Sequence, residues 1–124
     1  ATTTIYQDKQ GVMWFGRWSG GLIQYNPKDG SCKHYYSDPE DSASIGTNTL
    51  TTILEDRSGA LWVGGLGGIN RLNRETGSFK HYMSGSKILS LYEDSGGSLW
   101  AGTIHGLYRN DQKEDRFINF FDPC

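Results

Sequence analysis

Two acidic pairs are the first residues in this sequence whose types could support catalysis. Glu55-Asp56 and Glu93-Asp94 each place two carboxyl groups together, and paired carboxyl groups can act as general acid and base in glycoside cleavage. The members of each pair are adjacent, however, so on an extended strand their side chains point to opposite faces. Each Asp also begins a turn-like sequence, which favours a role in capping that turn over a role in catalysis.

Metal and phosphate chemistry are also disfavoured by the residue pattern. The histidines His34, His81 and His105 are scattered, whereas a metal site needs several His, Asp or Cys ligands that converge on one point. The glycine-rich run 64–68 resembles a phosphate-binding loop, but the Lys-Ser/Thr pair of a P-loop does not follow it. We therefore expect no catalytic residue, no metal and no cofactor.

A unit that occurs three times along the chain explains where the acidic residues lie. In each copy an Asp is followed by a Gly, then by a Trp, and then by a second Gly, always at the same spacing. The copies are Asp8-Gly11-Trp14-Gly16, Asp56-Gly59-Trp62-Gly64 and Asp94-Gly97-Trp100-Gly102. Agreement at so many positions indicates tandem copies of one supersecondary unit.

The residue types within the unit predict four short antiparallel strands. In the first turn the Asp caps the backbone with its carboxylate, and the Gly three residues later tolerates a positive φ. The second strand begins at the Trp and contains the second Gly, whose missing side chain lets another backbone or ring approach. Four such strands in about 40 residues are typical of a propeller blade. The predicted fold is all-β, a β-propeller fragment of three four-stranded antiparallel blades.

The repeats also predict how the chain is divided. We place blade 1 at about residues 3–36, a polar linker at 37–48, blade 2 at about 49–83 and blade 3 at about 87–121. The Trp and Ile/Leu positions are expected to fill the space between neighbouring blades, because one sheet cannot bury both of its faces. Propellers usually close with about four to eight blades. We therefore expect the outer faces to meet further blades of a longer parent, or copies of this chain, as in a six-bladed ring of two copies.

Composition restricts the partners further. The 12 Lys and Arg residues against 14 Asp and Glu give a net charge of −2, without the basic stripe that nucleic-acid binding requires. No apolar run approaches membrane-spanning length, so we expect no direct membrane insertion. Cys32 occupies the position of Phe79 and Phe117 in the other copies, and we expect it to pack there as a small hydrophobe, far from Cys124.

The repeat resembles the two-component regulator propeller repeat. The residues that carry the resemblance are 53–64, 67–73 and 77–82, together with the polar connector 36–48. It implies a sensor segment on the periplasmic or extracellular side of a bacterial inner membrane. In that family propellers receive a ligand, in many cases an oligosaccharide, and the signal passes to a kinase across the membrane. One departure is Gln7, which replaces the Glu that precedes the turn Asp in the other copies.

The loops between the second and third strands are the predicted binding rim. They comprise residues 17–20, 65–67 and 103–105. Arg17, Trp18 and His105 are the side chains there best able to stack on a sugar ring or to hydrogen-bond its hydroxyl groups. Trp18 has no aromatic counterpart in the other copies, and we predict these three residues as ligand contacts. The alternative for Trp18 is that it covers part of a blade interface.

Three functions remain open at this point. The preferred one is a non-catalytic, ligand-sensing propeller segment. A propeller-type lyase or glycan-active enzyme is the second, since propellers also host catalysis at their central channel; it needs a charged cluster in the axial loops, where only Arg17 and His105 are available. The third is a protein-interaction scaffold whose blade faces are themselves the partner surface.

Overall fold

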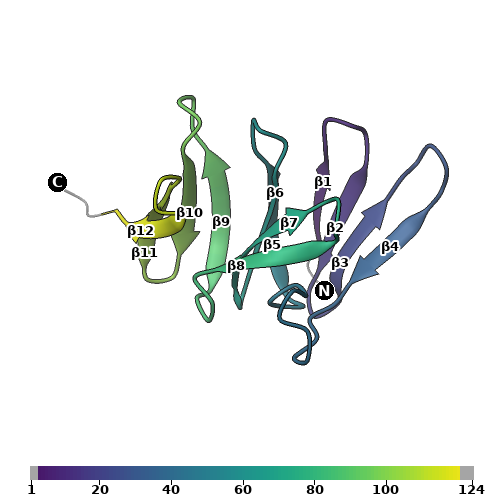
Figure 1. Ribbon diagram of the computed structural model, residues 1–124, viewed down its shortest axis with the longest axis horizontal. Coiled ribbons are helices and arrows are strands. Elements are labelled where there is room, and N and C mark those ends of the chain that lie inside the picture. Colours follow the sequence, from purple (N-terminus) through teal and green to yellow (C-terminus); the bar gives the residue numbers. More distant parts are fainter. Residues whose placement is uncertain (1–2, 121–124) are drawn as a thin grey trace.

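Three antiparallel sheets make up the protein in the computed structural model, which describes residues 3–120. Their strands, in chain order, are β1 (Thr3–Gln7), β2 (Met13–Arg17), β3 (Gly21–Tyr25), β4 (Cys32–Tyr35), β5 (Leu50–Glu55), β6 (Leu61–Gly65), β7 (Gly68–Asn73), β8 (Ser78–Tyr82), β9 (Ile88–Glu93), β10 (Leu99–Thr103), β11 (Gly106–Asp111) and β12 (Arg116–Asn119). Each sheet takes four consecutive strands, and the sheets stand side by side as successive blades (Figure 1). The predicted all-β fragment of three four-stranded blades is confirmed.

Tight turns join the first two strands of each blade and lie together along one edge, the upper edge in Figure 1. Gly11, Gly59 and Gly97 have φ values of 86°, 90° and 86°, in the left-handed region that glycine tolerates best. The loops between the second and third strands lie along the opposite edge. The blades therefore present two chemically distinct edges, a turn edge and a loop edge.

Apolar side chains between neighbouring sheets form two separate cores. In the first core, Trp14 and Leu22 of blade 1 pack against Leu50, Leu61 and Val63 of blade 2. The second core joins the other face of blade 2 to blade 3, and its buried members are Trp62, Ile69, Tyr82, Ile88, Leu99 and Ala101. Blade 2 is thus covered on both faces, while blades 1 and 3 are each covered on one.

The glycine in the second strand of each blade marks the place where the next blade crosses. A Cβ atom on Gly16 would lie 2.9 Å from Cβ of Leu50, and one on Gly64 would lie 2.8 Å from Cγ2 of Ile88. Contacts that short do not occur between carbon atoms in proteins, so the first strand of the following blade can pack only on a glycine.

The connection between blades 1 and 2 is more than a polar linker. Its Ile45 is fully buried in the first core. The backbone N–H of Gly46 donates to Oδ1 of Asn70 at 2.8 Å, and the N–H of Phe79 donates to the Ala43 carbonyl at 2.8 Å. The connection therefore packs against blade 2 through residues 43–46. The division of the chain at the stated blade limits stays a prediction.

Cys32 is exposed, contrary to the expected packing. It pairs with Tyr25 on the face of blade 1 that has no neighbour, whereas its counterpart Phe79 contacts the ring of Tyr35 in the preceding blade. The position is the same, but only a preceding blade would bury it. Cys124 lies outside the described residues.

Candidate functional site

Each repeat Asp holds both its own turn and the Trp of the following strand. Oδ1 of Asp56 accepts the backbone N–H groups of Ser58 and Ala60 at 2.9 and 3.0 Å, and Oδ2 accepts the indole N–H of Trp62 at 2.8 Å. The equivalent indole bonds of Asp8 and Asp94 are 2.9 and 2.8 Å long. The turn cap was predicted from the sequence, whereas the indole bond was missed; the constant Asp-to-Trp spacing was its signal.

In blades 2 and 3 these hydrogen bonds favour the ionised form of the turn carboxylate. The indole N–H of Trp100 has the largest influence on Asp94 and lowers the pKa of its carboxyl group. For Asp56, burial favours the neutral form, but hydrogen bonds from Ser58 and Trp62 outweigh it and its pKa is lowered as well. A carboxyl group with a lowered pKa carries no proton near neutral pH, so these residues are poorly suited to act as general acids.

In blades 2 and 3 the Glu before the turn Asp reaches across to the preceding blade. Oε1 of Glu55 accepts the backbone N–H of Lys9 at 2.9 Å, and Oε2 of Glu93 accepts that of Arg57 at 3.1 Å. The two members of each acidic pair thus serve different blades, as their opposite directions on the strand require. This contact was not foreseen; its signal was the acidic residue repeated before the Asp in the second and third copies.

Arg74 closes the turn edge of the first interface. Its guanidinium group lies 3.1 Å from Oδ2 of Asp8 and 2.9 Å from Oε2 of Glu55, so it bridges one carboxylate from each blade. Both carboxylates are buried, and the guanidinium also lies over the ring of Trp14 at 5.7 Å. The position of Arg74 in its turn corresponds to Gln112 in blade 3, so the repeat does not supply this bridge at the second interface.

The predicted binding residues all lie on the loop edge. Arg17 ends β2, Trp18 follows it and His105 lies between β10 and β11, in loops at the lower edge of Figure 1. Trp18 is 48% exposed, so it is available to a ligand and is not sealed in a blade interface. Among residues 3–120 no hydrogen bond or ring contact joins Trp18 to Arg17 or His105. Their role as ligand contacts stays a prediction.

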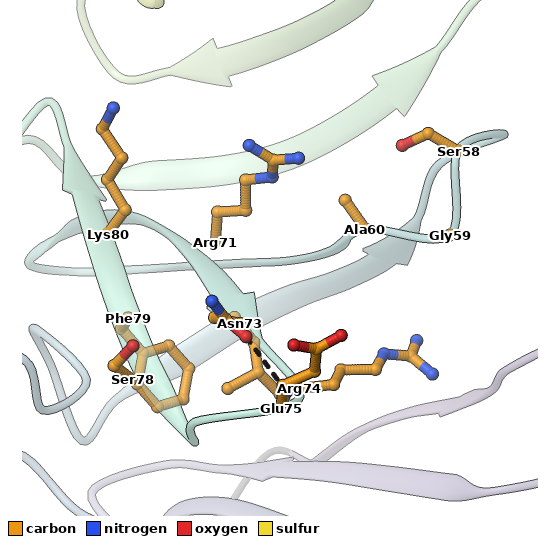
Figure 2. A pocket seen from close by; sticks show the side chains of 11 residues that line it. Ser58, Gly59, Ala60, Arg71, Asn73, Arg74, Glu75, Ser78, Phe79 and Lys80 are labelled. Atoms are coloured by element: carbon orange, nitrogen blue, oxygen red, sulfur yellow. Dashed lines mark hydrogen bonds between the residues drawn. The ribbon is translucent and has the colours of Figure 1, made fainter.

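A hollow of about 590 Å³ on the outer part of blade 2 gathers cations that sequence reasoning did not single out (Figure 2). Arg71, Arg74 and Lys80 line it beside a single carboxylate, that of Glu75. Arg74 is held by the bridge described above, and Lys80 pairs with Asp115. Arg71 is exposed and lies over the ring of Trp62 at 5.6 Å. These side chains come from strand and turn positions with no common spacing, so no sequence pattern marks them.

Within the described range 3–120, no three His, Cys, Asp or Glu side chains gather as a metal centre. No helix of this range has the length and apolar character that crossing a membrane requires.

The repeated sheets and their Asp–Trp turns define the class of protein as a β-propeller, of which this chain forms consecutive blades. The chain matches the two-component regulator propeller family over residues 1–16, 44–67 and 82–105, which together make just over half of its length. It belongs to that family, as the repeat residues indicated.

Known relatives are much longer than this chain. Histidine kinase P4 of Formosa agariphila is 37% identical over 89 residues, which cover 68% of this chain and 6% of the kinase. The extracellular domain of a protein described as a hybrid two-component system from B. thetaiotaomicron matches 97% of this chain and 18% of its own length, with a TM-score of 0.81 and 28% identity. The chain therefore spans only a small part of the relatives that it matches.

An enzyme shares the fold as well. Virginiamycin B lyase from Staphylococcus aureus superposes with a TM-score of 0.70 and 19% identity, covering 96% of this chain and 40% of the lyase. At that identity the likeness shows the propeller fold alone, because unrelated activities are built on the same fold.

Proposed function

We propose that the chain is a segment of the extracytoplasmic ligand-sensing propeller of a two-component regulator. The observation that carries the proposal is the match of 97% of the chain, at 28% identity, to the extracellular domain of a hybrid two-component system. The matching histidine kinase supports the same context. In this function the segment is non-catalytic and lies on the periplasmic or extracellular side of the membrane. It helps to recognise a ligand, and the parent protein relays the binding to a kinase.

A carbohydrate or another small polar ligand suits the loop edge. The exposed indole of Trp18 offers a flat apolar face on which a sugar ring can stack, and an indole N–H group can donate a hydrogen bond. Arg17 and His105 are exposed on the same edge and can hydrogen-bond hydroxyl groups. Blades that complete the ring would add their own loops to this edge, so the three residues form part of a larger site.

The remaining blades of the parent, or copies of this chain, are the proposed protein partners. Leu107 and Phe120 on the uncovered face of blade 3 are 41% and 42% exposed, while their buried counterparts Leu22 and Tyr82 are 0% and 6% exposed. Blade 3 thus offers a following blade the same apolar surface that blades 1 and 2 offer. A scaffold function would use these faces alone, without a ligand.

The lyase alternative is favoured only by the shared fold. An enzyme would need an acid and a base that are free to react. The turn carboxylates Asp8, Asp56 and Asp94 are each committed to hydrogen bonds with their own turn and Trp. Product formation from a candidate ligand, followed by chromatography, separates the enzyme from the sensor.

Replacing Trp18 with Ala tests the sensing proposal. Oligosaccharides are titrated into the protein by calorimetry, and Trp18→Ala is expected to weaken binding by about tenfold, the low end of the roughly 1–3 kcal/mol that stacking of a nucleic-acid base on an aromatic ring contributes. The unfolding midpoint should stay within a few degrees, because Trp18 is half exposed. Ile104→Ala, which removes an exposed apolar side chain on the same edge, is the matched control. Unchanged affinity in Trp18→Ala removes this residue from the site.

A further inference from the structure

The two blade interfaces differ at one polar position on the turn edge. At the first interface, the guanidinium of Arg74 bridges Asp8 and Glu55 at 3.1 and 2.9 Å. At the second interface, the corresponding carboxylates are those of Asp56 and Glu93, and the turn that would carry the arginine has Gln112 instead. The second interface therefore repeats the two carboxylates of the first, but its Gln112 supplies no guanidinium group to bridge them.

A cavity of about 270 Å³ lies at this position of the second interface. Its lining includes the acidic side chains Asp56, Glu93 and Asp115, together with Arg71, Asn110 and Gln112. Asp56 already accepts four hydrogen bonds from its own turn and from Trp62. Within residues 3–120 Glu93 accepts a single one, from the backbone N–H of Arg57, and so retains acceptor capacity for a ligand in the cavity.

Asn110 supplies an independent sign that the cavity is built for a polar occupant. Its counterparts in the other blades are Tyr25 and Leu72, and Leu72 is part of the first apolar core. Asn110 is only 8% exposed, and its Nδ2 has no hydrogen-bond partner among residues 3–120. A buried amide without partners costs stability unless something else binds it. If nothing bound in this cavity, an apolar side chain at position 110 would stabilise the interface more than Asn110 does.

We propose that this cavity binds a small molecule that carries a guanidinium group at one end and a carboxylate at the other, as arginine does. The guanidinium takes the place that Arg74 occupies at the first interface and donates to Glu93, beside Asp56. Its planar set of N–H donors matches carboxylate acceptors, which a neutral amide does less well. Arg71, which also lines the cavity, attracts the carboxylate end, and the unpartnered Nδ2 of Asn110 donates to that carboxylate, since a guanidinium offers no acceptor.

The size and place of the cavity agree with such a ligand. Its volume lies just below the roughly 300–1,000 Å³ of sites that hold drug-sized molecules, as suits an amino acid. It opens among turn residues such as Ser58 and Gly97, on the edge opposite Trp18 and His105. Failure of the sugar-binding proposal would therefore leave this one standing, and the reverse also holds.

The first experiment titrates L-arginine and L-citrulline into the isotopically labelled protein and follows the side-chain amide signals by NMR. Citrulline has nearly the same shape, but its neutral ureido group replaces the guanidinium. L-Arginine is expected to shift the Asn110 side-chain signals and to bind about tenfold or more tightly than L-citrulline, because charged hydrogen bonds are the stronger ones. Equal binding of the two, or no shift at Asn110, overturns the proposal.

Two variants complete the test. Gln112→Arg supplies the guanidinium from the chain itself and is expected to raise the unfolding temperature and to abolish L-arginine binding, whereas Gln112→Met, similar in size and uncharged, keeps it. If Gln112→Arg binds L-arginine as well as the unaltered protein does, the site is wrongly placed. Should that variant not fold, Glu93→Gln decides: it keeps an acceptor for the Arg57 N–H, and L-arginine affinity must fall about tenfold.

Discussion

The same repeat positions meet different surroundings in blade 1 and in blade 3. Trp14 and Leu22 are covered by blade 2 and belong to the first core. Trp100 and Leu107 occupy the corresponding positions of blade 3, where Leu107 is 41% exposed and the Trp100 ring makes an edge contact with Phe120, with ring centroids 5.0 Å apart. The backbone and the Asp–Trp bond are alike in both blades, so the difference lies in the neighbour alone.

The glycines in the second strands also differ in whether a following blade contacts them. Gly16 and Gly64 are each crossed by a side chain of the following blade, Leu50 or Ile88. At Gly102 the only neighbour that an added Cβ would meet among the described residues is Ser90 of its own blade. Each blade therefore supplies one side of an interface, and the contribution of a repeat residue to stability depends on whether the adjacent blade buries it.

The largest expected effect comes from removing the Trp on the two sides of this comparison. Trp62→Ala should lower the free energy of unfolding by about 3–5 kcal/mol, the range for truncating a buried aromatic residue. Trp100→Ala should cost roughly half of that or less, because within residues 3–120 no following blade covers the outer surface of Trp100. Urea unfolding of the two variants measures both values.

The solution mass of the protein sharpens this result. Light scattering during size exclusion shows whether copies of the chain cover the open faces of blades 1 and 3. Equal losses for Trp62→Ala and Trp100→Ala in a monomer would contradict the comparison. A discrete oligomer that dissociates in Trp100→Ala would show that the open face of blade 3 is covered by another copy.

A smaller difference in the free energy of unfolding is expected between alanine variants of Gly64 and Gly102. Gly64→Ala places a methyl group 2.8 Å from Ile88 Cγ2 and 2.8 Å from Thr52 Cγ2, and such overpacking costs about 1–3 kcal/mol. Gly102→Ala meets only the Ser90 hydroxyl, which can rotate away, so its cost should be below about 1 kcal/mol. The same urea measurement applies. A larger loss for Gly102→Ala than for Gly64→Ala would mean that Gly64 is not the crossing point.

Local features of the fold were open to prediction because residue type alone determines them. The Asp-x-x-Gly turns require a carboxylate cap and a positive φ, and one turn shows both: Asp56 caps the N–H of Ala60, and Gly59 has a φ of 90°. The contacts that were missed join distant residues: Glu55 binds the N–H of a residue 46 positions away, and Arg74 binds Asp8 across 66 positions. Their existence depends on how the blades stack, which no spacing within one repeat reveals.

The candidate sites were likewise predictable only where they depend on a single repeat and not on the stacking of blades. Exposure of Trp18 follows from its place in a loop, which the repeat predicts. The inter-blade cavity does not follow, because it arises from the simultaneous change of two repeat positions, Asn110 and Gln112, that face the neighbouring blade. Cys32 illustrates the reverse case: its repeat position is apolar, yet it is exposed because that face of blade 1 has no neighbour.

The smallest effect tests the Asp–Trp bond on the open side of blade 3. The pKa of Asp94 is lowered first by the indole N–H of Trp100 and then by the backbone N–H of Ser98. Trp100→Phe keeps the ring but removes that donor, so the pKa of Asp94 should rise toward its ordinary value of 3.8, as measured by a ¹³C NMR titration of the carboxyl group. Asp29, in blade 1, is the internal control, since its lowered pKa arises from hydrogen bonds that it accepts from Ser31.

The sign of the pH dependence follows from the same bond. Because the carboxyl of Asp94 has a lower pKa in the folded chain, ionised Asp94 stabilises the fold above pH 3.8, and this contribution is lost as the pH falls through the folded pKa. In Trp100→Phe the free energy of unfolding should therefore fall slightly less steeply as the pH is lowered. The Asp56–Trp62 bond of blade 2 is unaltered and should still contribute its own pH dependence. An unchanged pKa of Asp94 in Trp100→Phe would mean that the turn N–H groups alone hold this carboxylate, and that its bond to the indole positions the ring without shifting the charge.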